Sequence, residues 1–540
     1  MKHLTFLAVM FLFLASACNP QKESKILKQS DFPTPPVAEV RPDTFVEFSH
    51  QRIDEYYWMK DKTNPKVIEY LNAENAYADT VMASTKGLQE TIYNEILGRM
   101  KEDDESYPSL RDGYYYYSRS EAGKQYPTYC RKKGSMDAAE EIIFDVNEMG
   151  EGKPAFIFRG YSISPDNSKA AYFFNETGSY AEFQMRIKDL ASGEDVGFTV
   201  DGATSIAWAN DNKTLFFGVI DNTLRSYQVR RQKLDETESQ LVYQEDDAKF
   251  SAYVSGSKTK EYIFIGSASS TTSEEHFILA DQPMSKPALF MPRKQGVEYS
   301  VHAHKDFFFA QYKDKENLNG KIYKVPLKGY ENMSTWTEFV AHNPNVRIES
   351  LDIVKDYVSL ELRRNGLTEI EVKPISGGTS KALDFPEPVY NISLIGNPEY
   401  DATTIRYSYT SLNRPTTLYE YNILNGETPK LKVQEVPSGF NPDDYIVERI
   451  WATAQDGVKI PMAIVYKKEL KRDGSNPALI YSYGSYGISS DVYFSTAYYS
   501  LIDRGFVFAI AQIRGGGDMG EQWYEDGKLL KKKNNLGCVE

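Results

Sequence analysis

The sequence predicts a seven-bladed β-propeller that follows a helical arm and precedes the start of an α/β sheet domain. Two observations lead to this prediction. A phrase made of an Asp/Asn turn and an aliphatic-aromatic strand recurs between residues 102 and 436. Further on, two continuous apolar runs, 477–480 and 505–511, are separated by a Gly/Tyr/Ser loop and a helix-like segment. Apolar strands between glycine loops are typical of the buried centre of an α/β sheet.

Length and composition set the broad class. A chain of 540 residues is too long for one ordinary core, so we expect at least two domains. The net charge of −14 disfavours a nucleic-acid partner; it fits cationic peptides as partners, or serves solubility alone. The three cysteines, Cys18, Cys130 and Cys538, are far apart and show no disulfide framework or metal-ligand spacing.

The first 18 residues have the pattern of a targeting segment. Lys2 and His3 precede an apolar run over residues 4–14 that is too short to span a bilayer, and small residues then precede Cys18. This order resembles a bacterial lipoprotein box, which implies that Cys18 is lipidated and becomes the mature N-terminus. The other interpretation is a secreted protein in which Cys18 is incidental. Residues 19–31 would form a polar tether, and we expect a location in the cell envelope, either lipid-anchored or periplasmic.

Residues 32–101 are predicted to form an arm of helices. Asn64-Pro65 is a helix start, because proline is tolerated in the first turn, where its missing N–H costs nothing. Apolar residues then recur at helical spacing, and a second set continues the pattern after Gly87. The first set is Val67, Ile68, Leu71, Ala73, Ala76, Tyr77 and Val81, and the second is Leu88, Ile92, Ile96 and Leu97.

Short strands and turns replace the helical spacing between residues 102 and 436. The segment 164–173, SPDNSKAAYF, is echoed by 208–217, WANDNKTLFF, and more weakly by 255–264, SGSKTKEYIF. Corresponding strand positions lie 44 and 47 residues apart, a period typical of four-stranded propeller blades. With about 330 residues available, seven blades fit this period.

We expect no catalytic or metal centre within the propeller. His302 and His304 alternate on one face of a predicted strand, but no acidic third ligand has a suitable spacing. They are therefore interpreted as ordinary strand residues. The protein is expected to need no metal and no cofactor.

The C-terminal domain is predicted to begin near Pro437. Residues 448–466 form two strands around an Asp-Gly turn, which is a hairpin signal. Residues 481–487 read YSYGSYG, and residues 501–534 read LIDRGFVFAIAQIRGGGDMGEQWYEDGKLLKKKN. These stretches resemble the first part of the α/β-hydrolase domain of the prolyl oligopeptidase family, and most closely its oligopeptidase B branch. The resemblance implies a seven-bladed β-propeller plus an incomplete α/β-hydrolase domain, with an N-terminal helical arm that packs on the hydrolase domain.

The resemblance also assigns roles to single residues. Tyr483 matches a tyrosine whose hydroxyl helps to form the oxyanion hole, and a phenol donor suits a tetrahedral oxyanion. Asp491 and Arg514 are assigned to substrate binding. Asp491 falls near an acidic position that recognises basic residues beside the scissile bond, while Tyr493 stands where a second acid is usual, which weakens a dibasic preference. Arg514 opens the RGGG loop. The implied substrates are short peptides cleaved after Arg or Lys.

The Ser-Asp-His triad of this family is not found in the sequence. No serine lies in a G-x-S-x-G motif, and none of the six histidines follows His342. Without a base a serine hydroxyl is a weak nucleophile, so we expect the chain to be inactive. The resemblance stops at about Asn535, as at a frameshift, a premature stop or a gene-model break. We therefore expect exposed sheet edges and apolar faces, with poor stability or aggregation.

Two alternatives stay open. If the chain is an enzyme, the alternative is a post-proline peptidase. The residues Ser485-Tyr486 in the YSYGSYG stretch disfavour this alternative. The other belongs to a different class: a catalytically inactive propeller lipoprotein that binds peptides or envelope partners.

Overall fold

The computed structural model describes residues 33–537, and the chain divides into two compact units, Met1–Glu95 and Ile96–Glu540. Cys18, the predicted tether and Cys538 lie outside the described residues. Among the helices of the described part, none is long and apolar enough to cross a membrane.

The first unit is largely helical, as predicted for the arm. The side chain of Asn64 accepts a hydrogen bond from the backbone N–H of Lys66 at 3.0 Å, so the long helix begins where the sequence predicts. Val67 is buried on this helix, whereas Ile68 is exposed. The packing of the arm on the C-terminal domain stays a prediction. The helices are η2 (Tyr57–Lys60), α1 (Pro65–Met82), η3 (Ala83–Thr85) and α2 (Lys86–Gly98), whose last residues belong to the second unit.

A hairpin inside the arm corrects the expectation of helices alone over residues 32–101. β1 (Asp43–Glu47) and β2 (His50–Asp54) pair antiparallel. The turn residues Phe48 and Ser49 have φ angles of 49° and 65°, a left-handed conformation that non-glycine residues rarely adopt. Because no glycine, proline or asparagine marks this turn, the hairpin could not be predicted from turn residues.

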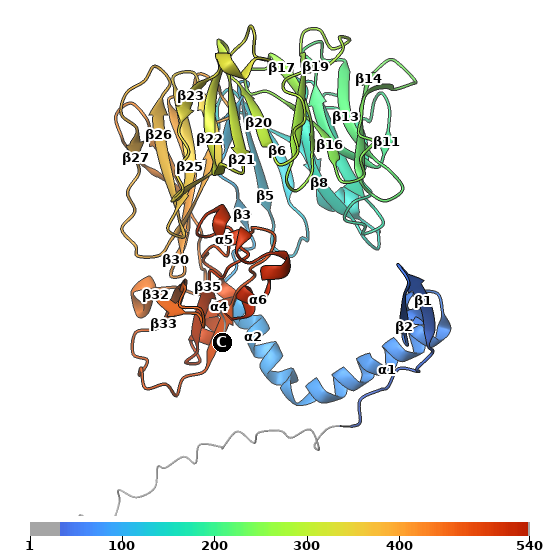
Figure 1. Ribbon diagram of the computed structural model, residues 1–540, viewed down its shortest axis with the longest axis vertical. Helices are drawn as coiled ribbons and strands as arrows, with labels where there is room; N and C mark the ends of the chain where they lie inside the picture. Colours follow the sequence, from blue (N-terminus) through green and yellow to red (C-terminus); the bar gives the residue numbers. More distant parts are fainter. Residues whose placement is uncertain (1–32, 538–540) are drawn as a thin grey trace, which may run out of the picture. The chain divides into compact units, whose positions relative to one another are not determined.

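Seven sheets form the blades of the propeller, which confirms the predicted number (Figure 1). Six of them contain four antiparallel strands in chain order, and the first has a fifth strand, β4, paired with β5. The blades are, in order, β3 (Asp104–Glu105), β4 (Ser109–Arg111), β5 (Tyr114–Ser120), β6 (Thr128–Lys133) and β7 (Glu140–Asp145), followed by the short helix α3 (Val146–Gly150); β8 (Ile157–Ile163), β9 (Lys169–Asn175), β10 (Gln184–Asp189) and β11 (Val200–Asp201); β12 (Ala203–Trp208), β13 (Thr214–Ile220), β14 (Ser226–Lys233) and β15 (Gln240–Gln244); β16 (Ser251–Gly256), β17 (Tyr262–Ala268), β18 (Ser273–Leu279) and β19 (Ala288–Leu289); β20 (Glu298–Ala303), β21 (Phe307–Asp314), β22 (Asn317–Pro326) and, after η4 (Met333–Thr335), β23 (Thr337–Val340); β24 (Val346–Val354), β25 (Tyr357–Arg364), β26 (Leu367–Pro374) and β27 (Lys381–Ala382); β28 (Asn391–Gly396), β29 (Thr404–Ser411), β30 (Arg414–Asn422) and β31 (Lys430–Val433).

The repeated turn phrase occupies the same place in successive blades. It joins β8 to β9, β12 to β13 and β16 to β17, the first two strands of the second, third and fourth blades. Asn167, Asn212 and Lys260 stand at the left-handed position of these turns, with φ angles of 60°, 58° and 62°. Asparagine tolerates this conformation better than most residues. The third copy has lysine instead, and its sequence echo is accordingly weaker.

The spaces between successive blades are filled with apolar side chains. Between the fifth and sixth blades, Phe309, Val358 and Leu360 are at most 1% exposed. The seventh and first blades meet differently, because within residues 33–537 none of the buried apolar clusters between blades joins them. Instead Lys432 Nζ lies 2.7 Å from Asp104 Oδ2. The ring is therefore closed by side-chain contacts.

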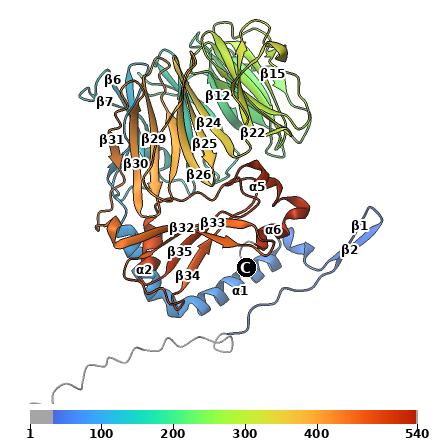
Figure 2. The ribbon, with the colours of Figure 1, turned by 60° about the vertical axis from the view of Figure 1, so that its left-hand side comes forward.

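The C-terminal sheet has the strand order β32-β33-β35-β34, and its last two strands are parallel. Its first two strands form the predicted hairpin, in which Gly457 takes the turn with a φ of 84°. Figure 2 shows the four strands side by side and α5 next to the propeller, where Glu521 Oε1 lies 3.0 Å from Lys313 Nζ. The elements are η5 (Pro442–Asp444), β32 (Tyr445–Thr453), β33 (Lys459–Lys467), β34 (Ala478–Tyr481), α4 (Thr496–Ile502), β35 (Val507–Ala511), α5 (Glu521–Glu525), η6 (Leu529–Lys531) and α6 (Lys533–Leu536).

β34 is the open edge of this sheet. Leu479, Ile480 and Tyr481 are 41%, 47% and 48% exposed, whereas Ile510 on the neighbouring strand is fully buried. Successive side chains of a strand point to opposite faces, so both faces of the sheet are uncovered along β34. The expected exposure of a sheet edge and its apolar faces is thereby confirmed for this strand.

Replacing Phe309 by alanine is expected to lower the free energy of unfolding by about 3–5 kcal/mol, because the ring is fully buried between two blades. Chemical denaturation followed by intrinsic fluorescence measures the loss. Tyr180→Ala is the control, since this ring is 85% exposed and its removal should change stability by less than about 0.5 kcal/mol. Equal losses in the two variants would contradict the assignment of Phe309 to the core.

Candidate functional site

Two loops follow the carboxyl ends of β34 and β35. We call residues 482–491 the tyrosine loop and residues 512–518 the glycine loop. The backbone N–H of Gly487 donates to the carbonyl of Gly515 at 3.0 Å, so the two loops are in direct contact. Loops at the carboxyl ends of strands are where open α/β sheets place their ligands. The candidate site is therefore the region where the tyrosine loop and the glycine loop meet.

Glycine is required where the two loops cross. A Cβ atom on Gly515 would lie 2.3 Å from the carbonyl oxygen of Gly484, and one on Gly517 would lie 2.5 Å from that of Gly487. Real Cβ atoms do not approach backbone oxygens so closely. The glycines of the YSYGSYG and RGGG motifs thus have a structural role, which is to let two backbones pass in contact.

Tyr483 is presented at the start of the tyrosine loop. Its side chain is 46% exposed, so its hydroxyl can reach a ligand at the loops. The backbone beside it is fixed from the C-terminal segment, since Lys532 Nζ donates to the carbonyl of Gly484 at 2.7 Å and the side chain of Asn535 donates to the same oxygen. The role of Tyr483 as oxyanion-hole donor stays a prediction.

Asp491 is held by the propeller. Arg363, on β25, donates from Nη1 to Asp491 Oδ1 at 2.6 Å and from Nη2 to Oδ2 at 2.9 Å. The same guanidinium donates from Nε to Glu349 Oε1 at 2.7 Å. The Arg363 side chain is 4% exposed and that of Asp491 is 32% exposed, so loss of Asp491 would leave a buried positive charge hydrogen-bonded to Glu349 alone among the described residues. Contact between Asp491 and a substrate stays a prediction, but both of its oxygens are already hydrogen-bonded.

Tyr493 adds no second charge beside Asp491. Its hydroxyl is hydrogen-bonded to that of Tyr498. Burial, reinforced by this hydrogen bond, raises the pKa of Tyr498 well above its ordinary value. A phenol is uncharged near neutral pH, so the tyrosine loop carries one acid where the resemblance leads one to expect two.

Arg514 is buried rather than open to a ligand. It is 5% exposed, pairs with Asp456 at the β32–β33 turn, and donates from Nη2 to the carbonyl of Asn534 at 3.3 Å. These contacts tie the glycine loop to the hairpin. They give Arg514 a structural role, and its predicted role in substrate binding stays a prediction.

Asp518 was not predicted as a site residue. It is 1% exposed, and its Oδ1 accepts the backbone N–H of Ser490 at 2.7 Å. Its Oδ2 is buried without a hydrogen-bond partner among the described residues. Burial raises the pKa of Asp518 to about 7, although the positive charge of Arg363 opposes the shift. Its position directly after the glycine triplet was the one available sequence signal.

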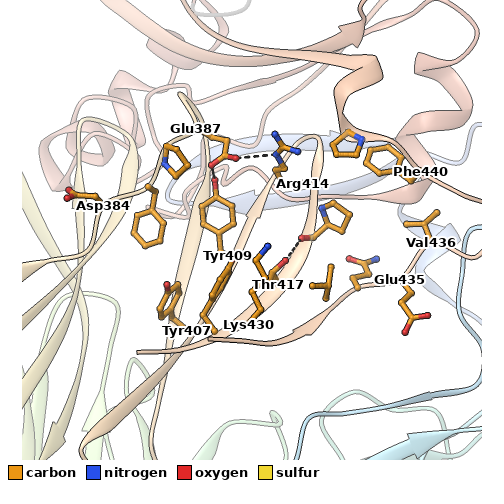
Figure 3. Close-up of a pocket in the computed structure, with 17 residues that line it drawn as sticks. Asp384, Glu387, Tyr407, Tyr409, Arg414, Thr417, Lys430, Glu435, Val436 and Phe440 are labelled. Atoms are coloured by element: carbon orange, nitrogen blue, oxygen red, sulfur yellow. Dashed lines mark hydrogen bonds and ion pairs between the residues drawn. The ribbon is translucent and has the colours of Figure 1, made fainter. Parts of the chain in front are cut away.

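A cavity of about 720 Å³ lies beside the seventh blade. Its lining combines strands β29 to β31 with the segments 384–387 and 433–442. Figure 3 shows Glu387 between Tyr409, whose hydroxyl donates to it, and Arg414, whose Nε donates to it at 3.2 Å. No residue of the tyrosine or glycine loop lines this cavity. It is therefore separate from the candidate site.

The two propeller histidines have local partners. His302 Nε2 shares a hydrogen bond with Ser300 Oγ at 3.1 Å, and His304 Nε2 shares one with the carbonyl of Lys355 at 2.9 Å. Burial lowers the pKa of His302 to about 4. Over residues 33–537, no group of three or more His, Cys, Asp or Glu side chains is placed to hold a metal ion.

Two protein-family models match the chain. The one described as the prolyl oligopeptidase N-terminal beta-propeller domain matches residues 35–434. The one described as the prolyl oligopeptidase family matches residues 492–537. Together they cover the seven blades and the glycine loop, whereas the tyrosine loop lies between the two matched ranges.

The chain is also similar to whole proteins. It is 37% identical over 530 residues to dipeptidyl aminopeptidase BI of Pseudoxanthomonas mexicana, covering 93% of this chain and 72% of the relative. It is 32% identical over 511 residues to Protease 2 of Moraxella lacunata, covering 93% and 73%. The structure of oligopeptidase B from Leishmania major matches with a TM-score of 0.88 and 31% identity, over 93% of this chain and 75% of that one. Oligopeptidase B from Trypanosoma brucei, in a closed form with covalently bound antipain, matches with a TM-score of 0.88 and 29% identity, over 94% and 76%.

Changing Asp518 to asparagine is expected to remove part of the pH dependence of stability. The folded-state pKa of about 7 lies above the ordinary value of 3.8, so between these values the folded protein keeps a proton that the unfolded chain has lost. The free energy of unfolding of the native protein therefore falls as the pH rises through this window, by up to about 1.4 kcal/mol per pH unit. The Asp518→Asn variant lacks this contribution.

Urea denaturation at about pH 5 and about pH 7 measures the difference. Asp235→Asn is the control, because this side chain is exposed and its removal should leave the native pH dependence unchanged. The same pH dependence in the Asp518→Asn variant as in the native protein would show that Asp518 is not protonated in the folded state.

Proposed function

Because the chain belongs to the prolyl oligopeptidase family of serine peptidases, we propose that it supplies the propeller and the substrate-facing loops of a peptidase that cleaves short peptides after arginine or lysine. The observation that carries this proposal is the contact between the tyrosine and glycine loops, which presents Tyr483 at the carboxyl ends of two sheet strands. The names of the relatives, Protease 2, dipeptidyl aminopeptidase BI and oligopeptidase B, support action on peptides. The net charge of −14 favours basic ligands.

In this proposal each part has a physical role. In a peptidase with a complete triad, the Tyr483 hydroxyl would donate a hydrogen bond to the oxyanion of the tetrahedral intermediate, where such a donor is worth several kcal/mol in the transition state. The propeller restricts access to short peptides and excludes folded proteins. No cofactor is required.

We propose that the chain of 540 residues binds peptides without cleaving them. Its sequence holds no G-x-S-x-G motif and no histidine after His342, so a nucleophile paired with a base is not available at the loops.

The purified chain is expected to give no turnover of a fluorogenic peptide ending in arginine, because no base activates a nucleophile. The same preparation is expected to bind a fluorescein-labelled arginine peptide, measured by fluorescence anisotropy. Tyr483→Phe serves as the matched variant for both assays. Turnover that stays with the chain through successive purification steps, and that falls in the Tyr483→Phe variant, would contradict the proposed lack of catalysis.

A second candidate function is a catalytically inactive propeller lipoprotein that binds peptides or envelope partners. The presence of seven blades favours it, because a propeller can bind partners without catalysing a reaction. Peptide binding that does not depend on the arginine of the peptide would favour this function over the peptidase-derived one.

We further propose that Cys18 is lipidated and anchors the chain to a membrane of the cell envelope. Cys18→Ser is expected to move the chain expressed in a bacterial host from the membrane fraction to the soluble fraction, and to abolish incorporation of labelled palmitate. A single acyl chain binds a membrane only marginally, and multiple chains bind stably, so the change should be nearly complete. Cys538→Ser is the control and should keep the label. Label retained in the Cys18→Ser variant would contradict the anchor.

A further inference from the structure

We propose that Arg363 is a specificity-determining residue, a built-in counter-ion that occupies Asp491 and so excludes a second basic side chain of the substrate. This inference rests on the proposed function, which makes short basic peptides the ligands, and on the predicted role of Asp491 in binding them. Under this proposal the chain selects peptides that carry one basic residue rather than two.

The first argument is the geometry of the pair. The guanidinium of Arg363 makes two parallel hydrogen bonds to the two oxygens of Asp491, at 2.6 and 2.9 Å. This bidentate arrangement is the strongest that arginine makes with a carboxylate. Arg363 therefore already makes the bidentate contact with Asp491 that the guanidinium of a substrate arginine would otherwise make.

The second argument is burial. The side chain of Arg363 is 4% exposed, while that of Asp491 is 32% exposed. Arg363 thus approaches the carboxylate from the protein side, and Asp491 retains a face toward solvent. A ligand could reach Asp491 from that face if its oxygens were free.

The third argument is the charge balance around the pair. Glu349 accepts a further hydrogen bond from Arg363 at 2.7 Å, and its other oxygen lies 3.7 Å from Nε of Arg347. These two arginines and two carboxylates balance in charge, so Asp491 is not an uncompensated anion, and the carboxyl groups of Glu361 and Asp518 also interact with the pair. Arg363 is also already fixed in place, whereas a peptide side chain loses conformational and translational freedom on binding.

The fourth argument concerns Tyr493, which follows the end of the tyrosine loop by two positions. Tyr493 pairs its hydroxyl with Tyr498, so the loop has no second acid that could hold a basic side chain without Asp491. With Asp491 neutralised, the position beside it is uncharged and lined in part by phenols.

The test compares two labelled peptides that differ in one residue, arginine or citrulline, placed next to a C-terminal arginine. Citrulline keeps the size of arginine and removes the charge. Fluorescence anisotropy gives the dissociation constants. The informative variant is Arg363→Met combined with Glu349→Gln, which removes one charge of each sign and so keeps the net charge of −14. Circular dichroism and a thermal melt establish that it is folded.

The native chain is expected to bind the arginine and citrulline peptides equally. The double variant is expected to bind the arginine peptide about tenfold more tightly than the native chain does, with the citrulline peptide unchanged, because Asp491 is then free. Adding Asp491→Asn to the double variant should abolish the gain. A folded double variant without any gain would overturn the proposal.

A second comparison decides the matter if the double variant does not fold. Asp491→Asn alone should leave the affinities of the native chain for both peptides equal to each other. A native preference for the arginine peptide that Asp491→Asn removes would show that Asp491 is open to the substrate, and would overturn the proposal. The proposed function is judged separately: failure of the native chain to bind the citrulline peptide contradicts peptide binding, whereas a gain in the double variant still supports the role of Arg363.

Discussion

The polar contacts between the propeller and the C-terminal sheet are the interactions on which the candidate site depends. The side chain of Gln512, in the glycine loop, donates to the carbonyl of Gly366 at 2.9 Å, and the hydroxyl of Tyr499, on α4, donates to the carbonyl of Leu412 at 2.6 Å. With the buried Arg363 pair, these contacts join the sheet and its loops to the sixth and seventh blades. Buried polar groups are costly unless every one of them is paired. The loops therefore hold their conformation only when the propeller is in place.

Along its edge strand β34, the same sheet is not packed against other elements to the same extent within residues 33–537. Ile510 on β35 is fully buried, while Ile480 on the adjacent β34 is 47% exposed. The sheet is thus well packed where it meets the blades and uncovered along one edge. The tyrosine loop starts from this boundary, since it follows β34 directly. The backbone of the tyrosine loop is fixed by hydrogen bonds with the glycine loop and with Lys532 and Asn535, rather than by packing beneath β34.

Local signals predicted most of the fold, and they failed where the determining contact is distant in sequence. The propeller was predictable because turns such as that of Asn212 repeat a left-handed residue whose type tolerates that conformation. The β1–β2 hairpin was not, because Phe48 and Ser49 carry no turn signal. Tyr483 and Asp491 could be singled out by resemblance, but the partner of Asp491 could not. Arg363 lies 128 positions away on another domain, and no periodicity or spacing distinguishes it from an exposed strand arginine.

The closure of the ring by charged side chains makes its seven joints unequal. Six are filled by apolar groups, whose attraction weakens on cooling and is strengthened by salts that are excluded from protein surfaces. The joint between the last and first blades includes the partly exposed pair of Lys432 and Asp104, and added salt weakens such an exposed ion pair. Ionic strength and temperature therefore act on different joints of one ring. At high ionic strength the junction between the seventh and first blades is therefore the first place where the ring would open, while the six apolar junctions stay closed.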